Sequence, residues 1–327
     1  MPRSRRQPPE VPMQPASSPT PVGFFPIDSY LSLPSAPEAW IVQDLLPAGG
    51  WLNIYGPPKE GKSFAALQLA LDIGGGSSDW LGFPIHTHGP VLYLQLDTPR
   101  SLWRQRLIDI QTSSGLTCEG VHFADKESVP YPFDICNTAH GHPQWLANHV
   151  KAINPLVVVI DTLRELHSGD ENDSMQMQRV ISTLDSSIRP AACILISHSR
   201  KENMALPATD RDAVMDDNRG SGYVAGRMDA VVKINRKKLT YQGRTVDKHI
   251  LKLKRTAGHL WILDPGEDDA NIRAVLAMAE LTSLRQKAEV LSERTGRTVE
   301  ACRSILRRRG GGHDQMVKID DPPVTIN

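Results

Sequence analysis

The sequence predicts an α/β protein with a mostly parallel central sheet and a phosphate-binding loop near its start. In the middle of the chain, unbroken apolar runs alternate with segments of helical composition, which is typical of parallel strands buried on both faces. The stretch Gly56-Pro57-Pro58-Lys59-Glu60-Gly61-Lys62-Ser63 has the form G-x-x-x-x-G-K-S, which joins a strand to a helix in nucleotide-binding proteins. Together, these observations predict a P-loop NTPase fold.

The residues on either side of this motif supply the context that it requires. Residues 51–55 form an apolar run that predicts a buried strand, and residues 64–71 have helical composition and spacing. The glycines let backbone N–H groups surround a β-phosphate, and the helix N-terminus adds its positive dipole end. We therefore expect the motif and Phe64 to bind ATP, with Lys62 on the β- and γ-phosphates and Ser63 on Mg²⁺. A glycine turn that only precedes a helix is the alternative, and the flanking strand argues against it.

The remaining elements follow in an order that extends the sheet. Apolar runs predict strands at residues 91–96, 156–160, 192–196 and 230–234. Helices are predicted between them at residues 101–110 and 174–188. Residues 249–253 and 260–263 flank a glycine turn and predict a closing hairpin.

The chain divides into three predicted regions. Residues 1–36 contain many prolines, which bar regular helix, and predict a disordered tail. Residues 37–266 hold the α/β ATPase domain, and residues 267–327 predict a small helical C-terminal extension with a flexible end. Two helices within this extension have the spacing of a helix-turn-helix, and the second carries several arginines. A solvated basic helix is the alternative explanation of those arginines.

Composition excludes several classes of protein. Lysine plus arginine and aspartate plus glutamate number 37 each, so net charge indicates no nucleic-acid or membrane partner by itself. The four cysteines are widely spaced without a C-x-x-C pair, which argues against a disulfide framework or a metal knuckle. No apolar run approaches bilayer length. We expect a reduced, cytoplasmic setting without a membrane partner.

Acidic residues follow two of the predicted strands, at the sheet edge where ligands of parallel sheets bind. Asp161 ends the run 156–160, at the position of a Walker B acid that helps to hold Mg²⁺. A helix N-cap is the alternative role, which the regular apolar strand makes less favourable. Asp97 ends the run 91–96 and is the best candidate to orient the attacking water.

Three further side chains are candidates for the catalytic site. His198 follows the run 192–196 and could sense the γ-phosphate, although such a histidine is often only a satisfied polar group. Arg219 and Arg236 could complete the site of a neighbouring subunit as an arginine finger. Each of them could instead be an ordinary surface arginine.

These motifs, in this order, resemble the RepA-like branch of RecA-fold ATPases, which includes plasmid-encoded hexameric replicative helicases. The resemblance spans roughly residues 39–264 and includes a segment around Arg219 and Arg236 that is similar to the arginine-finger segment of phage primase–helicases. The segments that carry it are Leu45 to Leu52, Val91 to Asp97 with Arg106-Leu107, Val159 to Leu163 with Gly169 to Asp173, Ile196 to Lys201, and Arg219 to Gly222 with Asp229 to Val232 and Arg236. The family usually has glutamate where Asp97 stands. Aspartate places the carboxylate one methylene further back, and a misplacement of about 1 Å can cost on the order of a hundredfold in rate.

The resemblance implies a RecA-like domain that forms a homo-oligomeric, hexameric ring and hydrolyses ATP with Mg²⁺ while acting on DNA, with single-stranded DNA as the expected form. Residues 164–173 and 199–218 would be the segments that face DNA in the ring channel. A nucleotide-switched regulatory ATPase that binds DNA without unwinding it is the main alternative. A stand-alone P-loop kinase is a third, which no acceptor-substrate motif favours.

Overall fold

The computed structural model of the chain describes residues 24–31, 39–114, 119–130, 132–199, 222–256, 258–264 and 283–295, with positions 275, 278, 281, 299, 302–303 and 306. Most of the predicted tail 1–36, Arg219, nearly all of the predicted DNA-facing segment 199–218 and the predicted flexible end lie outside these residues. A short helix, α1 (Ile27–Leu31), falls in one compact unit of residues 1–37, and the remaining elements fall in a second unit.

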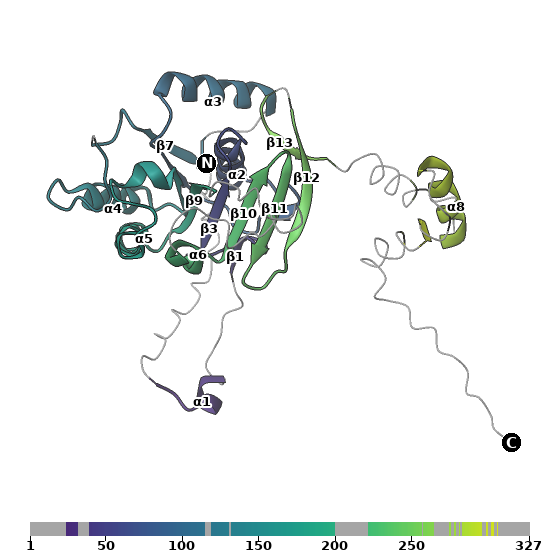
Figure 1. Cartoon of the computed structure of the whole chain (residues 1–327), viewed down its shortest axis with the longest axis horizontal. Coiled ribbons are helices and arrows are strands. Elements are labelled where there is room, and N and C mark those ends of the chain that lie inside the picture. Colours follow the sequence, from purple (N-terminus) through teal and green to yellow (C-terminus); the bar gives the residue numbers. More distant parts are fainter. Residues whose placement is uncertain are drawn as a thin grey trace, which may run out of the picture. The chain divides into compact units, whose positions relative to one another are not determined.

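A nine-stranded sheet forms the centre of the second unit, in the order β13-β12-β11-β10-β3-β9-β8-β6-β7 (Figure 1). All strands from β10 to β7 in this order are parallel to their neighbours, and β10 to β13 are antiparallel to one another. The strands are β3 (Trp51–Gly56), β6 (Val91–Gln95), β7 (Val121–Asp125), β8 (Val157–Asp161), β9 (Ala192–His198), β10 (Ala230–Asn235), β11 (Lys238–Gly243), β12 (His249–Arg255) and β13 (Trp261–Leu263). The predicted α/β class with a mostly parallel central sheet is confirmed.

Helices cover both faces of this sheet, and each face has its own hydrophobic core (Figure 1). The helices are α2 (Lys62–Gly75), α3 (Arg100–Ser114), α4 (His142–Ile153), α5 (Ser174–Ile188) and α6 (Gly222–Arg227), with a 3-10 turn η1 (Leu163–Leu166) after β8. Alternate residues of each strand enter opposite cores: Val157 and Val159 of β8 join α2 and α3, whereas Val158 and Ile160 join α4, α5 and α6. Because every residue of β8 is buried, the strand is an unbroken apolar run up to Asp161.

Smaller elements complete the fold. The strands β1 (Trp40–Val42) and β2 (Leu46–Pro47) form one ribbon, and β4 (Asp79–Trp80) and β5 (Phe83–Pro84) form another. In the C-terminal region, α8 (Leu284–Thr295) contributes to a separate small core of Val275, Ala288, Leu291, Cys302 and Leu306. The first of the two helices predicted in the C-terminal region, at residues 284–292, is therefore present and extends to Thr295, where the break 295–297 was predicted; residues 296 and 297 lie outside the described part.

The observed elements differ from the predicted ones in two ways. Helix α2 begins at Lys62, two residues before the predicted start, because Gly61 adopts a left-handed conformation (φ 87°) as its N-cap. The strands β7 and β11 and the helix α4 were not predicted from the apolar pattern. The consequence is that β7, and not β6, is the outermost strand at one end of the sheet.

Candidate nucleotide-binding site

The phosphate loop leaves β3 at the carboxyl edge of the sheet and enters α2. Its first glycine, Gly56, has a φ of 150°, and a Cβ at this position would collide with the backbone oxygen of Ile234 in β10. Its last glycine, Gly61, turns the chain into the helix. Both glycines are therefore required, the first by a close approach of backbone and the second by a positive φ. The loop ends with the N-terminus of α2, which is the geometry that binds phosphate.

Lys62 is the buried cation of the loop. Its ammonium group donates a hydrogen bond to the backbone oxygen of Pro57 at 2.8 Å and lies 3.5 Å from Nδ1 of His198. Burial lowers the pKa of Lys62 to about 8, against the opposing effect of Asp161, Glu60 and Asp97. The ammonium group thus lies within the phosphate loop, and its binding to the β- and γ-phosphates stays a prediction.

Ser63 and Asp161 bring two oxygen ligands together at the base of the loop. The Ser63 hydroxyl donates to Oδ1 of Asp161 at 3.1 Å, and the hydroxyl of Tyr93 donates to Oδ2 at 2.9 Å. Burial raises the pKa of Asp161 to about 6 although both hydrogen bonds oppose the change, and Asp97 raises it further. A hydroxyl and a carboxylate are hard oxygen donors, so Ser63 and Asp161 fit Mg²⁺. Tyr93 orients the carboxylate, a role that the strand pattern does not indicate.

Asp97 lies next to this pair in a turn that an ion pair anchors. In the sheet, Gln95 is level with Asp161 on one side and with Asp125 on the other, and Asp97 is exposed two residues further on. Its charge acts on the pKa values of both Asp161 and Lys62. Its carboxylate is therefore at the same edge as the phosphate loop, as predicted.

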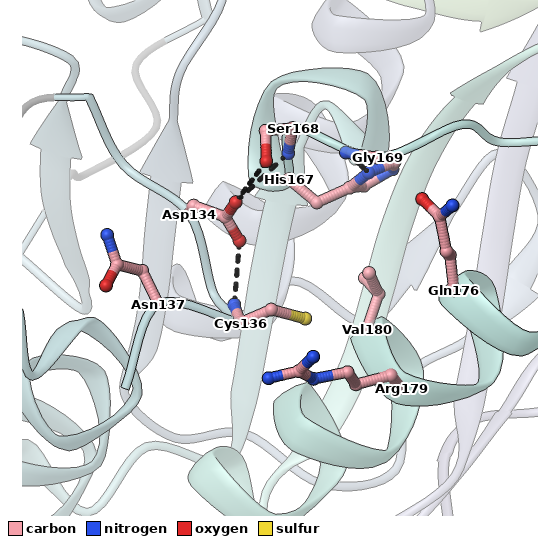
Figure 2. Close-up of a pocket in the computed structure, with 9 residues that line it drawn as sticks. All are labelled: Asp134, Cys136, Asn137, His167, Ser168, Gly169, Gln176, Arg179 and Val180. Carbon is pink, nitrogen blue, oxygen red and sulfur yellow. Dashed lines mark hydrogen bonds between the residues drawn. The ribbon is translucent and has the colours of Figure 1, made fainter. Parts of the chain in front are cut away.

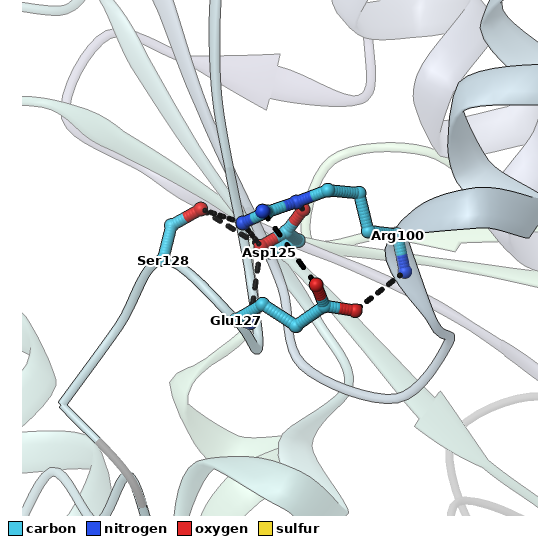
Figure 3. A network of polar contacts seen from close by, with 4 residues as sticks. All are labelled: Arg100, Asp125, Glu127 and Ser128. Carbon is cyan, nitrogen blue, oxygen red and sulfur yellow. Dashed lines mark hydrogen bonds and ion pairs between the residues drawn. The ribbon is translucent and has the colours of Figure 1, made fainter.

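Arg100 ties the end of this turn to β7 (Figure 3). Its guanidinium donates to both oxygens of Asp125, at 2.6 and 2.7 Å, and to the hydroxyl of Ser128 at 2.9 Å. The backbone N–H of Arg100 donates to Glu127 at 3.3 Å. The hydrogen bond from Arg100 is the largest cause that lowers the pKa of Asp125, to about 2. The turn that carries Asp97 is thus held at both ends, by β6 and by this ion pair.

The remaining predicted residues divide between the site and the undescribed region. His198 ends β9 beside Lys62, in register with Gly56 of β3. Arg236 is exposed in the turn between β10 and β11, and its backbone N–H donates to Glu60 of the phosphate loop at 2.8 Å. Arg219 lies outside the described residues. The structure therefore assembles Lys62, Ser63, Asp97, Asp161 and His198 at one edge, and the arginine-finger role stays a prediction.

Aromatic and cationic side chains cover the other side of the loop, and the sequence motifs did not indicate them. The guanidinium groups of Arg106 and Arg255 lie 5.1 and 4.8 Å from the ring centre of Phe64. Arg255 also lies 4.6 Å from the ring of Trp261, and His259 is 5.2 Å from Phe64. Phe64 therefore faces a guanidinium-rich surface rather than solvent alone.

A cavity of about 360 Å³ lies between the loop after β7 and α5 (Figure 2). Asp134 joins two of its walls, because its carboxylate accepts hydrogen bonds from the hydroxyl of Ser168 at 2.6 Å and from the N–H of Cys136 at 2.8 Å. Arg179 of α5 and His167 also line the cavity. His167, Ser168 and Gly169 in its lining belong to the predicted DNA-facing segment 164–173, and none of its lining residues belongs to the phosphate loop.

No helix within the described part of the chain is long and apolar enough to span a bilayer.

Residues 17–204, more than half of the chain, match the family model described as an AAA domain. Among solved structures, a KaiC-like protein from the hyperthermophilic archaeon Pyrococcus horikoshii is 14% identical, with a TM-score of 0.47, and the similarity covers 69% of this chain and 94% of that one. The match to the family model, together with the phosphate loop, establishes that the chain belongs to the AAA domain family of P-loop ATPases.

Proposed function

We propose that this protein is an ATP-hydrolysing, ring-forming motor that acts on DNA, most similar in role to a RepA-like replicative helicase of a mobile element or phage. The observation that carries the proposal is the 3.5 Å approach of Lys62 to His198. His198 ends β9, and the chain continues from there into the segment 199–218, which in this proposal faces the ring channel. Loss of the γ-phosphate would therefore act on that segment through Lys62 and His198, at the end of β9.

Each residue of the site has a defined role in this proposal. Lys62 binds the β- and γ-phosphates, and the N–H groups at the start of α2 surround them. Ser63 and Asp161 would hold Mg²⁺, which neutralises charge on the phosphate oxygens when it is bound. Asp97 accepts a proton from the attacking water and orients it. Tyr93 keeps the carboxylate of Asp161 in place through its 2.9 Å hydrogen bond.

The ring supplies the last group in this proposal. Arg219 or Arg236 would reach the γ-phosphate bound by the neighbouring subunit, as arginine fingers do. Support for Arg236 comes from its place in the β10–β11 turn, where its side chain is exposed while its N–H contacts Glu60. The guanidinium of Arg236 could therefore contact a second subunit, while its backbone N–H contacts the phosphate loop of its own subunit.

A strand-displacement assay run beside an ATPase assay, with and without single-stranded DNA, tests the proposal. We expect ATP hydrolysis that single-stranded DNA stimulates and unwinding that depends on ATP and Mg²⁺. Hydrolysis without any unwinding, under conditions in which the ring is verified by ultracentrifugation, would refute the helicase role. Lys62→Ala serves as the control that should lack both activities.

The alternative function is a nucleotide-switched regulatory ATPase that binds DNA without unwinding it. Asp97 favours it, because the shorter carboxylate lies further from the γ-phosphate than a glutamate would and slows hydrolysis. A mixing experiment separates the two functions. If Asp97 acts within its own subunit and Arg219 or Arg236 acts across an interface, Asp97→Asn and the arginine→Ala variant should each be inactive alone and active when mixed.

Mixed rings contain interfaces in which both groups are intact, which is why the mixture should recover activity. Variants that remain inactive in every mixture, despite verified co-assembly, would refute the shared site. Recovered hydrolysis that single-stranded DNA stimulates supports the motor. Recovered hydrolysis that DNA does not change supports the switch.

A further inference from the structure

The antiparallel end of the sheet contacts the phosphate loop through several groups, and one of them is the side chain of Trp261 of β13. The indole N–H of Trp261 donates to the backbone oxygen of Gly61 at 3.1 Å, across 200 residues of sequence. Gly61 is the N-cap of α2, and its oxygen also accepts the helical hydrogen bond from the N–H of Ala65 at 3.1 Å. This carbonyl therefore has two donors, one from its own helix and one from β13.

The position of Trp261 is itself fixed by α2. The side-chain amide of Gln68 accepts from the N–H of Trp261 at 2.9 Å and donates to its carbonyl oxygen at 3.0 Å, and both hydrogen bonds are buried. Trp261 is 3% exposed. The two buried hydrogen bonds to Gln68 and the burial of the ring leave the indole little freedom. Its N–H therefore points at the oxygen of Gly61 before any ligand binds.

The loop is packed tightly at the same point. A Cβ on Gly61 would collide with the guanidinium of Arg255 and would lie 2.9 Å from the Trp261 ring. Arg255 lies 4.6 Å from that ring and 4.8 Å from Phe64, so it fills the space between β13 and the loop. The β12–β13 hairpin thus presses against the turn in which the loop becomes a helix.

The hydrogen bond to Gly61 has a consequence for phosphate binding. The peptide group between Gly61 and Lys62 is planar and trans, so its C=O and N–H point in opposite directions. Holding the oxygen of Gly61 toward Trp261 and Ala65 fixes the N–H of Lys62 in the opposite direction, out of the N-terminal end of α2. That N–H is one of the donors that a β-phosphate would meet.

We infer that Trp261 is a positioning residue for the phosphate loop, which sets the direction of the Lys62 N–H before nucleotide binds. The inference rests on nucleotide binding at this loop and adds a contribution from the part of the sheet outside the strand–loop–helix motif.

Trp261→Phe tests the inference, since phenylalanine keeps an aromatic ring and removes the N–H. Benzothienylalanine at position 261 is a second variant that keeps the two-ring shape and replaces the N–H by sulfur. Trp103→Phe is the matched control, because Trp103 is also buried and its indole N–H has no partner among the described residues. Equilibrium dissociation constants for ATP, ADP and AMP, steady-state KM and kcat, and thermal melting are measured for all four proteins.

We expect the dissociation constants of ATP and ADP to rise by about three- to tenfold in both variants at position 261, the effect of one hydrogen bond to a backbone carbonyl. KM should rise with them, and kcat should change by less than about twofold, because the N–H of Lys62 contacts phosphate in the ground state as well as in the transition state. AMP has no β-phosphate, so its weak binding should not change. Trp103→Phe should bind all three nucleotides as the wild type does.

Unchanged ATP and ADP dissociation constants in the benzothienylalanine variant, with a wild-type melting temperature, would overturn the inference. Equal weakening of AMP and ADP would overturn it too, because the effect would then not involve the β-phosphate. Failure of the wild-type protein to bind ATP would refute the proposed function instead.

Discussion

We predict that breaking the ion pair between Arg100 and Asp125 slows the hydrolysis of ATP. Asp97 lies three residues before Arg100, and Arg100 holds the turn to β7 through hydrogen bonds of 2.6 and 2.7 Å (Figure 3). Arg100→Ala should release this turn and let the Asp97 carboxylate move. Because a displacement of about 1 Å can cost on the order of a hundredfold in rate, we expect kcat to fall by about ten- to a hundredfold. The dissociation constant of ATP should stay within about twofold, since the hydrogen bonds of Arg100 go to Asp125, Ser128 and Glu127 and not to the phosphate loop.

The same pair has a measurable effect on stability. The pKa of Asp125 is lowered from 3.8 to about 2, chiefly by the hydrogen bond from Arg100, which corresponds to at most about 2 kcal/mol of stability at neutral pH. Solvent screening reduces this to about 1 kcal/mol, because the Arg100 side chain is 50% exposed although that of Asp125 is 7% exposed. A lowered carboxyl pKa stabilises the fold fully above the unfolded value of 3.8. This stabilisation is lost as the pH falls toward 2.

The predicted effects on kcat and on stability are checked by steady-state kinetics, ATP binding and thermal melting of Arg100→Ala. Arg189→Ala is the matched control, because Arg189 also pairs with an aspartate, Asp185, at 2.7 Å and lies at the end of α5 next to the start of β9. Arg100→Lys, which can keep one of the two hydrogen bonds, should recover part of the lost kcat. A wild-type kcat in Arg100→Ala, with melting lowered by the expected few degrees, would refute the positioning of Asp97 by this pair.

The remaining predictions concern the groups that touch nucleotide and Mg²⁺. Lys62→Ala should abolish tight ATP binding and leave the circular dichroism spectrum unchanged; wild-type affinity in this variant, measured by calorimetry, would exclude the phosphate-loop assignment. The affinity for ADP should fall as the pH rises through about 8, because Lys62 then loses its proton in the free protein, and a dissociation constant that is flat from pH 7 to 10 would contradict the lowered pKa. Hydrolysis should fall as the pH drops through about 6, because Asp161 gains a proton there and its affinity for Mg²⁺ decreases, and raising the Mg²⁺ concentration should move that limit to lower pH. Tyr93→Phe should raise the Mg²⁺ concentration needed for half-maximal hydrolysis by about three- to tenfold, since Asp161 loses a 2.9 Å hydrogen bond, and an unchanged Mg²⁺ titration would exclude this role.

Much of the fold and part of the site follow from local patterns in the sequence. The run Val157–Asp161 is buried on both faces, so it consists of apolar residues and its end at the acid can be identified. The phosphate loop can be identified because both of its glycines are required by backbone geometry. These patterns single out Lys62, Ser63 and Asp161, which the fold brings to one edge of the sheet, without any knowledge of their partners.

The apolar pattern of the sequence did not predict elements whose residues are partly buried and partly exposed. The edge strand β7 and the hairpin strand β11 mix buried and exposed positions, and α4 buries only His142, Leu146 and Val150. Amphipathic segments of this length give weak periodicity. The short runs that form them do not differ clearly from loops.

The contacts that shape the site could not be predicted for another reason. The hydrogen bond from Trp261 to Gly61 joins residues 200 positions apart, and the bond from Tyr93 to Asp161 joins residues 68 apart. Such contacts depend on which strands become neighbours and in what register, which a single sequence does not state. The positioning residues of this site are therefore visible only in the folded chain.

The central claim is that Asp161, at the end of β8, holds the metal ion needed to hydrolyse ATP bound to the phosphate loop. The most direct measurement is the Mg²⁺-dependent release of phosphate from ATP in a single turnover, compared between the wild-type protein and Asp161→Asn at matched ATP occupancy. We predict phosphate release by the wild type and a loss of at least about a hundredfold in the variant, with ATP binding largely retained. A variant that releases phosphate at the wild-type rate, with the same dependence on Mg²⁺, would contradict the account.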